Sequence, residues 1–471
     1  MQGEITDIST TEISAKIDAL LDSFAHFGVE LGLERIERLL ANLGNPQRRV
    51  PIIHVAGSNG KGSVCAYLSS VLAAAGYRVG RYTSPHLVDW TERISLNGQA
   101  IAPTVLHTLL LETVAAIRPD QPSPTQFEVI TAAAWLYFAQ QQVDIAVVEV
   151  GLGGRLDATN VCDRPLVSII TSLSREHWQR LGPTLADISR EKAGILKSGC
   201  PAVLAPLPPE AEPVVRQRLA ELGCPAIFPL PAGDVGDGWA MFSGQTADGG
   251  SPVTLHPPLH PSLHPPLHPL KYRLPLPGAH QYLNSALAIA ALQVLQHSGW
   301  QIDDDAIAQG IAATQWPGRL QWSEWSDRPL LIDGAHNPAA AQVLRDYVDH
   351  SDRVVRPIHW VMGMLTTKDH ADIFAALLRP GDRLSLVPVP DHLSADPQEL
   401  ATLAQQVCPE LALCQVFPEV FAALAQAAQL ESDQTTILCG SLYLIGHFFR
   451  NRGLVAMGDR PAAEGRVASS P

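Results

Sequence analysis

A glycine-rich turn, HVAGSNGKGS at residues 54–63, joins two segments of opposite character. Residues 51–56 are a short apolar run that predicts a buried strand, and residues 64–75 have helical periodicity with Gly76 at a C-cap position. A strand, a glycine-rich turn with a lysine and a helix together hold phosphate, because backbone N–H groups and the helix N-terminus meet the anion. The sequence therefore predicts a phosphate-binding loop in which Lys61 supplies positive charge.

The spacing of this turn departs from the usual phosphate-loop pattern, GxxxxGK[ST]. Gly57 lies three residues before Gly60, and Gly62 separates Lys61 from Ser63. A glycine turn with an incidental lysine is the alternative, but the strand before the turn and the helix after it favour phosphate binding.

Strand-like and helix-like segments alternate through the first part of the chain. Strands are expected at 77–82, 143–150 and 166–171, and helices at 127–140 and 281–296. This alternation is typical of a parallel sheet with helices on both faces. The expected fold class is α/β, with a P-loop-type doubly wound sheet domain followed by a smaller Rossmann-like α/β C-terminal domain.

The length of 471 residues is too great for one hydrophobic core, which favours two domains. We expect the first domain at 1–304 and the second at 305–452, followed by a disordered tail at 453–471 that lacks core residues. The expected elements of the second domain are strands at 330–332, 358–361, 384–388 and 436–439, with a helix at 338–347.

A low-complexity tract at 251–270 repeats Leu-His-Pro every four residues, which suggests a metal-binding segment. However, prolines impose polyproline II with three residues per turn, so a four-residue period spreads the histidines around the axis. We therefore favour a surface loop.

Charge and composition exclude several classes of partner. The formal net charge of −14 argues against nucleic acid, because phosphate backbones are bound by basic surfaces. Seven cysteines without a CxxC pair indicate reduced thiols in a cytoplasmic protein. The polar N-terminus does not resemble a signal peptide, and no apolar run reaches the roughly 18 residues of a membrane helix. We expect a soluble, cytoplasmic protein without a membrane partner.

Polar residues follow three of the expected strands. Glu149 ends the apolar segment 143–150, Ser84 follows the strand at 77–82, and His177 follows that at 166–171. Carboxyl ends of parallel strands face the ligand crevice, where a carboxylate can hold Mg²⁺ bound to nucleotide phosphates. The sequence alone leaves two roles open for His177, that of a metal ligand and that of a polar group with a protein hydrogen-bond partner.

Taken in order, these segments resemble the folylpolyglutamate synthase/dihydrofolate synthase family of the Mur ligase superfamily. The resemblance runs from about Leu31 to Phe448, and the family's loop also has glycine after the lysine. The matching segments are ELGLERI, HVAGSNGKGS, TSPHL, ERI, QFE, EVGLGGRLDATN, EHW, EKAGI, HQYLN, PGRL, DGAHNP and CGSLYLIG.

The resemblance implies an ATP-dependent, ADP-forming ligase with Mg²⁺ as cofactor. Such an enzyme adds L-glutamate to dihydropteroate or to the γ-carboxyl of a reduced folate, through an acyl phosphate. The first domain would be the Mur-ligase-type ATP-binding domain, the second the glutamate-ligase domain, and the protein is expected to be a monomer that closes over ATP.

The resemblance also implies roles for individual residues. The expected ATP contacts are Ser58, Asn59, Gly60, Lys61, Gly62, Ser63, Asn284, Arg319 and Asp333. His336 lies in the same DGAHNP segment as Asp333. The expected metal ligands are Ser84, Glu149 and His177.

Lys192, in EKAGI, matches a lysine that carries a carbamate and so becomes an anion. An ordinary ion-pairing lysine is the alternative. Lys61, Glu149, His177 and Lys192 form the expected catalytic set.

The pterin side of the site is carried by three short segments. The residues implied to contact the pterin are Glu30, Leu31, Gly32, Thr125, Gln126, Phe127, Glu128, Leu156, Asp157 and Ala158. Gln126 replaces a frequent tyrosine, Glu176 replaces the aspartate before the histidine, and Thr367 replaces the aspartate of DKD. These departures bear on substrate details rather than on the ATP chemistry.

Two other functions are alternatives to this ligase. A peptidoglycan amino-acid ligase would need a UDP-binding domain of roughly a hundred residues before the loop, and only 56 residues precede Gly57. A nucleotide sensor without turnover would not need Lys61, Glu149, His177 and Lys192 together.

Overall fold

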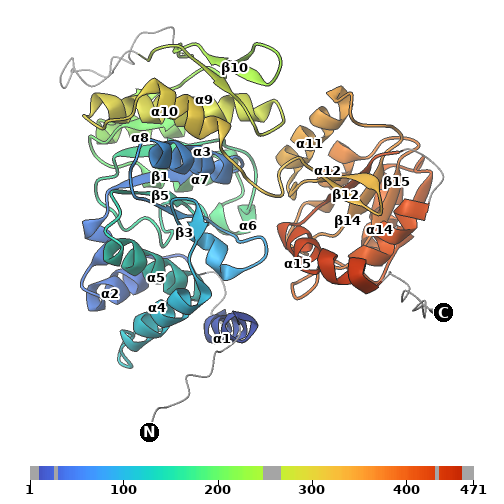
Figure 1. Ribbon diagram of the computed structural model, residues 1–471, viewed down its shortest axis with the longest axis horizontal. Coiled ribbons are helices and arrows are strands. Elements are labelled where there is room, and N and C mark those ends of the chain that lie inside the picture. The colour runs from blue at the N-terminus through green and yellow to red at the C-terminus, as the bar shows by residue number, and fades with distance from the viewer. Residues whose placement is uncertain (1–9, 26–29, 248–266, 430–433, 459–471) are drawn as a thin grey trace, which may run out of the picture. The chain divides into compact units, whose positions relative to one another are not determined.

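The computed structural model describes residues 10–25, 30–247, 267–429 and 434–458, with side chains described between residues 11 and 452. The chain divides into two compact units, Met1–Trp316 and Pro317–Pro471 (Figure 1). Within those ranges, no helix combines the length and apolar character needed to cross a membrane.

The first unit is built on an eight-stranded sheet with the order β4-β3-β2-β5-β1-β6-β7-β8. Strands β2, β5, β1, β6, β7 and β8 are parallel neighbours, and β3 and β4 continue the sheet in antiparallel fashion. The strands are β1 (Ile52–Ala56), β2 (Val79–Tyr82), β3 (Ile94–Leu96), β4 (Gln99–Ala100), β5 (Ile145–Glu149), β6 (Val167–Ile170), β7 (Ala202–Leu204) and β8 (Ala226–Ile227).

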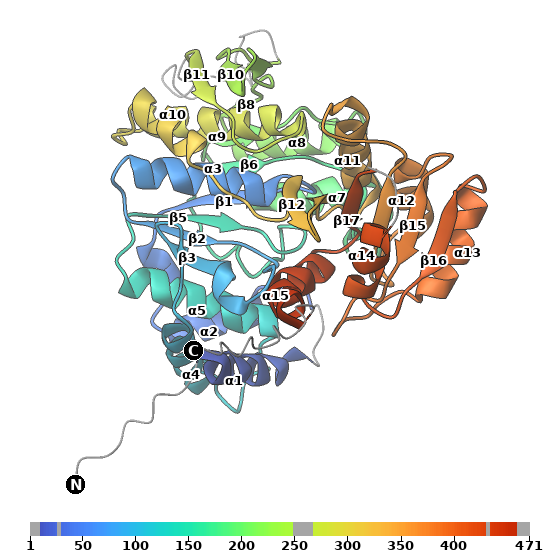
Figure 2. The same cartoon turned by 45° about the vertical axis from the view of Figure 1, so that its right-hand side comes forward.

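Helices cover both faces of this sheet, so its central strands are buried on both sides (Figures 1 and 2). Ile53 and Val55 of β1 pack in the core under α3 and α9, while Ile52 packs in the core formed with α5 and α4. The helices of the unit are α1 (Thr10–Asp22), α2 (Glu34–Asn42), α3 (Lys61–Ala74), α4 (Pro103–Ala115), α5 (Gln126–Gln140), α6 (Trp178–Leu181), α7 (Leu185–Lys192), α8 (Glu212–Leu222), α9 (His280–His297) and α10 (Asp304–Ala312), with 3-10 turns η2 (Pro46–Arg49), η3 (Trp90–Arg93) and η4 (Ala193–Ile195).

A small antiparallel sheet follows β8, formed by β9 (Gly233–Asp234), β10 (Trp239–Phe242) and β11 (Leu270–Arg273). Residues 251–266 of the 251–270 tract, which was predicted to be a surface loop, lie outside the described residues. Its last histidine, His268, is described and pairs with Asp304 at 2.9 Å.

The first unit extends beyond the boundary expected after residue 304. Helix α10 packs on α3, with Ile307 and Ile311 in the same core as Leu68, and Ser70 Oγ donates to Gly310 O at 2.6 Å. The chain therefore leaves this core only after Trp316.

The second unit holds a six-stranded sheet in the order β12-β13-β17-β14-β15-β16, parallel except for β12. Its strands are β12 (Gln321–Trp325), β13 (Arg328–Ile332), β14 (His359–Met362), β15 (Arg383–Leu386), β16 (Leu413–Val416) and β17 (Thr436–Cys439). Its helices are α11 (Pro338–His350), α12 (His370–Leu377), α13 (Pro397–Val407), α14 (Val420–Gln429) and α15 (Leu442–Gly458).

The predicted fold class is confirmed, with differences at the element ends. Helix α3 begins at Lys61 rather than at residue 64, because the glycine turn leads directly into the helix. Helix α15 continues to Gly458, so the backbone is helical past the expected start of the tail at 453. Residues 459–471 lie outside the described residues.

Candidate active site

The turn between β1 and α3 has the form of a phosphate-binding loop. Gly60 has a φ of 89°, and a Cβ atom there would lie 2.5 Å from Asn284 Oδ1, so only glycine fits. The N–H groups of Lys61, Gly62 and Ser63 belong to the first turn of α3, where a helix leaves its amides without intrahelical acceptors. These amides and the positive end of the helix dipole can receive an anion.

The segment after β6 holds the first half of this loop. Ser58 N donates to Ser172 O at 2.8 Å, and Asn59 N donates to Ser172 Oγ at 2.9 Å. Thr171 Oγ1 donates to Asn59 O at 2.6 Å. The amides of Ser58 and Asn59 thus already have protein acceptors, which favours the amides from Lys61 onward for the anion. Sequence reasoning missed Ser172, although hydroxyls crowded directly after a strand could have indicated it.

Two lysines converge on one carbonyl oxygen of the loop. Lys61 Nζ donates to Gly57 O at 2.8 Å and to Ser58 O at 3.1 Å. Lys192 Nζ donates to the same Gly57 O at 2.9 Å and to Glu176 Oε1 at 2.7 Å. The structure therefore brings Lys192, at the end of α7, against the glycine-rich loop.

The Lys192–Glu176 pair is buried. Burial by itself would raise the pKa of Glu176, but Lys192, followed by Lys61 and His177, lowers that pKa to about 2. Burial lowers the pKa of Lys192, and Glu176 opposes this shift. The short contact and the Gly57 carbonyl both favour the charged ammonium form. Buried groups with shifted pKa values cluster at functional sites, so the pair is a candidate site group.

Ser84 and Glu149 meet at the carboxyl ends of the neighbouring strands β2 and β5. Ser84 N donates to Glu149 Oε2 at 3.2 Å, and the carboxylate is buried. A hydroxyl and a carboxylate are oxygen donors of the kind that Mg²⁺ prefers, and it completes its shell with phosphate and water. No group of three or more His, Cys, Asp or Glu side chains in the described ranges is placed to hold a metal ion. The oxygen donors of Ser84 and Glu149 fit Mg²⁺ together with phosphate and water.

His177 occupies the N-cap of the short helix α6, with a left-handed φ of 47°. A positive charge on His177 lowers the pKa of the neighbouring Glu176, after the larger effects of Lys192 and Lys61. In the sequence, His177 directly follows this carboxylate, which pairs with Lys192.

Asn284 reaches the loop from α9. Its Nδ2 donates to Gln281 Oε1 at 3.1 Å, and Gln281 Nε2 donates to Ser63 Oγ at 3.3 Å. Gln281 also accepts from Tyr67 OH at 3.3 Å. Gln281 was not predicted as a site residue, although it lies in the same HQYLN segment as Asn284.

An aromatic residue explains the extra glycine of the loop. A Cβ atom on Gly62 would lie 2.6 Å from Cζ2 of Trp316, the last residue of the first unit. Arg81 lies over the same indole ring at 5.1 Å. The residue after the loop lysine must therefore lack a side chain.

The three segments expected to contact a pterin lie together. Arg35 Nε pairs with Glu128 Oε2 at 3.0 Å, and Arg35 also pairs with Glu30 Oε2 at 3.0 Å. Gly32 N donates to Leu156 O at 3.3 Å. Arg35 lies within the ELGLERI segment, and no role was predicted for it. The arginine is the residue that ties two of the segments.

Glu128 closes the first turn of α5 as part of a capping box. Thr125 N donates to Glu128 Oε2 at 2.7 Å, and Glu128 N donates to Thr125 Oγ1 at 3.2 Å. The second carboxylate oxygen, Oε1, is buried with no hydrogen-bond partner among the described residues. A buried acceptor of this kind suits a ligand N–H group.

The other expected pterin residues differ in their surroundings. Phe127 faces Gly151, where a Cβ atom would lie 2.9 Å from Phe127 Cε1, and Gln126 Nε2 donates to Asp22 Oδ1 at 3.4 Å. Asp157 accepts from Leu152 N at 2.8 Å and from the amide and hydroxyl of Thr159, which organises the loop after Glu149. Burial raises the pKa of Asp157, and these hydrogen bonds oppose the shift. Ala158 is buried in the neighbouring core.

Arg319, Asp333 and His336 gather within the second unit. Asp333 follows β13 and accepts from Leu320 N at 2.9 Å and Ala335 N at 2.8 Å. Burial raises the pKa of Asp333, and Arg319 opposes this shift. His336 Nδ1 lies 2.8 Å from Gly334 O.

Comparisons with known proteins identify the family of the chain. Residues 55–292 match the model of the Mur ligase middle domain, and residues 319–451 match that of the dihydrofolate synthetase C-terminal domain. Dihydrofolate synthetase of Saccharomyces cerevisiae is 34% identical over 442 residues, covering 90% of this chain and 98% of the relative.

Two solved structures are similar over nearly the whole chain. Escherichia coli FolC in complex with DHPP and ADP has a TM-score of 0.76 and 30% identity, covering 95% of this chain and all of that one. The bifunctional folylpolyglutamate synthase/dihydrofolate synthase of Yersinia pestis, with AMPPNP and Mn ion, has a TM-score of 0.75 and 31% identity, covering 95% and 100%. The chain belongs to the folylpolyglutamate synthase/dihydrofolate synthase family of Mur ligases.

Proposed function

We propose that the chain is an ADP-forming ligase that uses ATP to join L-glutamate to dihydropteroate, to the γ-carboxyl of (poly)glutamyl folates, or to both. The acceptor carboxylate would be phosphorylated, and the glutamate amine would then displace phosphate from the acyl phosphate. The observation that carries this proposal is the convergence of Lys61 and Lys192 on the loop beside a buried carboxylate, in a chain of this family.

The chain's own residues supply the charge that phosphoryl transfer requires. Two anions, the acceptor carboxylate and the γ-phosphate, must approach each other. We assign to Lys61 and to the amides of Gly62 and Ser63 the stabilisation of the transferred phosphoryl group, with Ser58, Asn59 and Gly60 shaping the loop. Asn284, and Arg319 with Asp333 in the second unit, are the further proposed nucleotide contacts.

Ser84, Glu149 and His177 are the proposed ligands of Mg²⁺. When bound, the ion neutralises phosphate charge and orients the nucleotide. Similarity to a structure determined with AMPPNP and Mn ion supports this assignment.

We retain the proposal that Lys192 is carbamylated. Burial lowers the pKa of its amine, and the neutral amine is the form that adds carbon dioxide. A carbamate would change the attraction to Glu176 into repulsion, which a divalent cation offsets. ¹³C NMR of protein in labelled bicarbonate should show a carbamate signal that is absent from a Lys192→Met variant. Identical spectra would reject the modification.

The acceptor is proposed to lie among Glu30–Gly32, Thr125–Glu128 and Leu156–Ala158. The free oxygen of Glu128 supports a ligand that presents an N–H group, as a pterin does. The match of residues 319–451 to a dihydrofolate synthetase domain favours dihydropteroate as one acceptor. We expect the enzyme to act as a monomer, which light scattering would test.

A product assay tests the function directly. Purified chain is incubated with Mg-ATP and L-glutamate, and dihydropteroate or tetrahydrofolate is offered separately. ADP release that requires both glutamate and an acceptor, with the glutamylated product identified by mass spectrometry, supports the proposal. ATP binding without acceptor-dependent release would instead indicate a nucleotide sensor.

A further inference from the structure

A four-residue motif occurs twice in the first unit. Gly199-Cys200-Pro201-Ala202 precedes β7, and Gly223-Cys224-Pro225-Ala226 leads into β8. Both strands lie at one edge of the large sheet and are parallel neighbours. The duplication therefore places two thiols at the start of adjacent strands.

The strand register puts the two cysteines opposite each other. Ala202 pairs with Ala226 in β7 and β8, and Ala202 N donates to Pro225 O at 2.8 Å. Gly199 N donates to Leu222 O at 2.9 Å. The separation in sequence between donor and acceptor is the same in both hydrogen bonds, so the two copies of the motif run side by side. Ala202 and Ala226 each follow their cysteine by two residues, and Cα atoms opposite each other in neighbouring strands lie about 4.8 Å apart. Disulfides span roughly 4.4–6.8 Å between Cα atoms, so cysteines two residues before this pair are close enough to be candidates.

Both thiols contact carbonyl groups of the segment that precedes β7. Cys224 Sγ donates to Lys197 O at 3.1 Å, and Cys200 Sγ lies 3.7 Å from Ser198 O, the next carbonyl along the chain. The backbone amide of Cys200 lies close enough to lower the pKa of the Cys224 thiol. Both side chains are buried.

We propose that Cys200 and Cys224 form an intramolecular disulfide when the protein meets a peroxide. One thiolate attacks hydrogen peroxide to give a sulfenic acid and water, and the second thiol displaces a second water as the sulfur–sulfur bond forms. Two thiols lose two electrons and two protons in total, and the peroxide is reduced to two waters.

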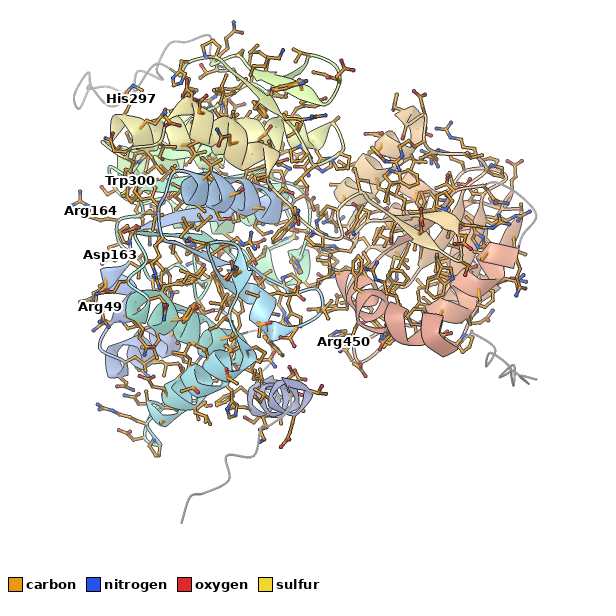
Figure 3. The ribbon with its side chains drawn as sticks, in the orientation of Figure 1. Arg49, Asp163, Arg164, His297, Trp300 and Arg450 are labelled. Carbon is orange, nitrogen blue, oxygen red and sulfur yellow. The ribbon has the colours of Figure 1, made fainter. Side chains whose placement is uncertain are left out.

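The surroundings of the two thiols make this oxidation slow, unlike that of a redox-sensor cysteine. Burial raises the pKa of Cys200, opposed by Arg164 and Lys197, and burial followed by Cys200 raises the pKa of Cys224 to about 11. Thiolate is the reactive form, so the rate of bond formation should rise with pH. Figure 3 shows Arg164 at the outer edge of the first unit.

The position of the pair predicts what the cross-link does. It lies where β7 and β8 begin, whereas Glu149 and the phosphate-binding loop lie where the parallel strands end. The disulfide should therefore leave ligase activity within twofold of the reduced enzyme. It should raise the midpoint of urea unfolding, because it closes the segment that contains β7 and α8.

The experiment treats the whole folded chain with hydrogen peroxide at about pH 8.5, with acid quenching, alkylation and intact-mass analysis. The expected result is loss of two of the seven alkylatable thiols, with a tryptic link between the peptides that contain Cys200 and Cys224. Cys200→Ser and Cys224→Ser should each abolish the link, and Cys162→Ser should retain it. Cys162 is the matched control because Lys197 also lies close to it.

Three outcomes would overturn the proposal: seven alkylatable thiols after oxidation, oxygen adducts without a link, or a link that involves Cys162. The wild-type peptide map decides the matter even where a serine variant folds poorly.

Discussion

Lys192 and Glu176 form an ion pair of 2.7 Å in which the side chains are only 2% and 9% exposed. Lys192 also donates a hydrogen bond to Gly57 O, the carbonyl oxygen that accepts from Lys61. The attraction within a buried ion pair adds little net stability to the fold. Removing one partner is strongly destabilising, because it leaves an uncompensated buried charge.

Glu176→Gln should therefore destabilise the protein by about 3–5 kcal/mol at neutral pH, because it leaves a buried ammonium unpaired. Urea unfolding in buffer depleted of carbon dioxide measures the change. Glu191→Gln is the matched control, since Glu191 pairs with an Arg155 that is 53% exposed, and such pairs contribute about 0–1 kcal/mol. Equal losses in the two variants would contradict the prediction.

The same pair should make stability sensitive to acid. The folded-state pKa of Glu176 is lowered to about 2 from an ordinary value of 4.5. Its contribution is therefore present above the unfolded-state pKa and is lost as pH falls from 4.5 toward 2. The difference in unfolding free energy between wild type and Glu176→Gln should shrink across that window. A difference that stays constant down to pH 3 would show that another group is responsible.

Lys61→Ala should lower kcat by at least a hundredfold, because a positioned charge on the transferred phosphoryl group is lost. Lys271→Ala is a suitable control, since this lysine lies over Trp239 in the small sheet. Steady-state kinetics with saturating ATP separates the effect on turnover from that on binding. A decrease of less than tenfold would remove Lys61 from the chemistry.

Gly62→Ala should disturb the loop because its new methyl group meets the Trp316 indole. We expect a loss in kcat/KM for ATP on the order of tenfold to a hundredfold, as misplacement of a reacting group produces. Trp316→Ala introduced into the Gly62→Ala variant should restore part of the loss. Gly233→Ala is the control, because a Cβ atom there meets nothing within 4 Å. Failure of the double variant to recover would place the cause elsewhere.

Arg35→Met should raise KM for the pterin acceptor by about tenfold while leaving KM for ATP unchanged, because Arg35 joins Glu30 to Glu128. The exposed neighbour Arg38, changed to Met, provides the comparison on the same helix. A similar rise in KM for both the acceptor and ATP would indicate a general folding defect, which circular dichroism would detect.

The central elements could be predicted because their signals are local. The apolar strand, the glycine turn and the helix that carries Lys61 follow one another in sequence, so the loop was visible without tertiary information. Glu149 was found because it ends an apolar run. The family resemblance supplied Lys192 and Asn284, which periodicity alone would not have linked to the loop.

The contacts that were missed depend on residues far apart in sequence. Ser172 holds Asn59, Trp316 approaches Gly62, and Arg35 reaches Glu128 only after folding. The end of the first unit at Trp316 was not predicted for a related reason. Helix α10 is amphipathic like many surface helices, and nothing in its own residues says that α3 is its partner.

The oxygen of Gly57 accepts hydrogen bonds from two ammonium groups, Lys61 and Lys192. Changes at the two lysines should therefore not be independent, because both ammonium groups share one acceptor. The free-energy cost of substituting both lysines should differ from the sum of the two single costs, and the coupling passes through the backbone of Gly57.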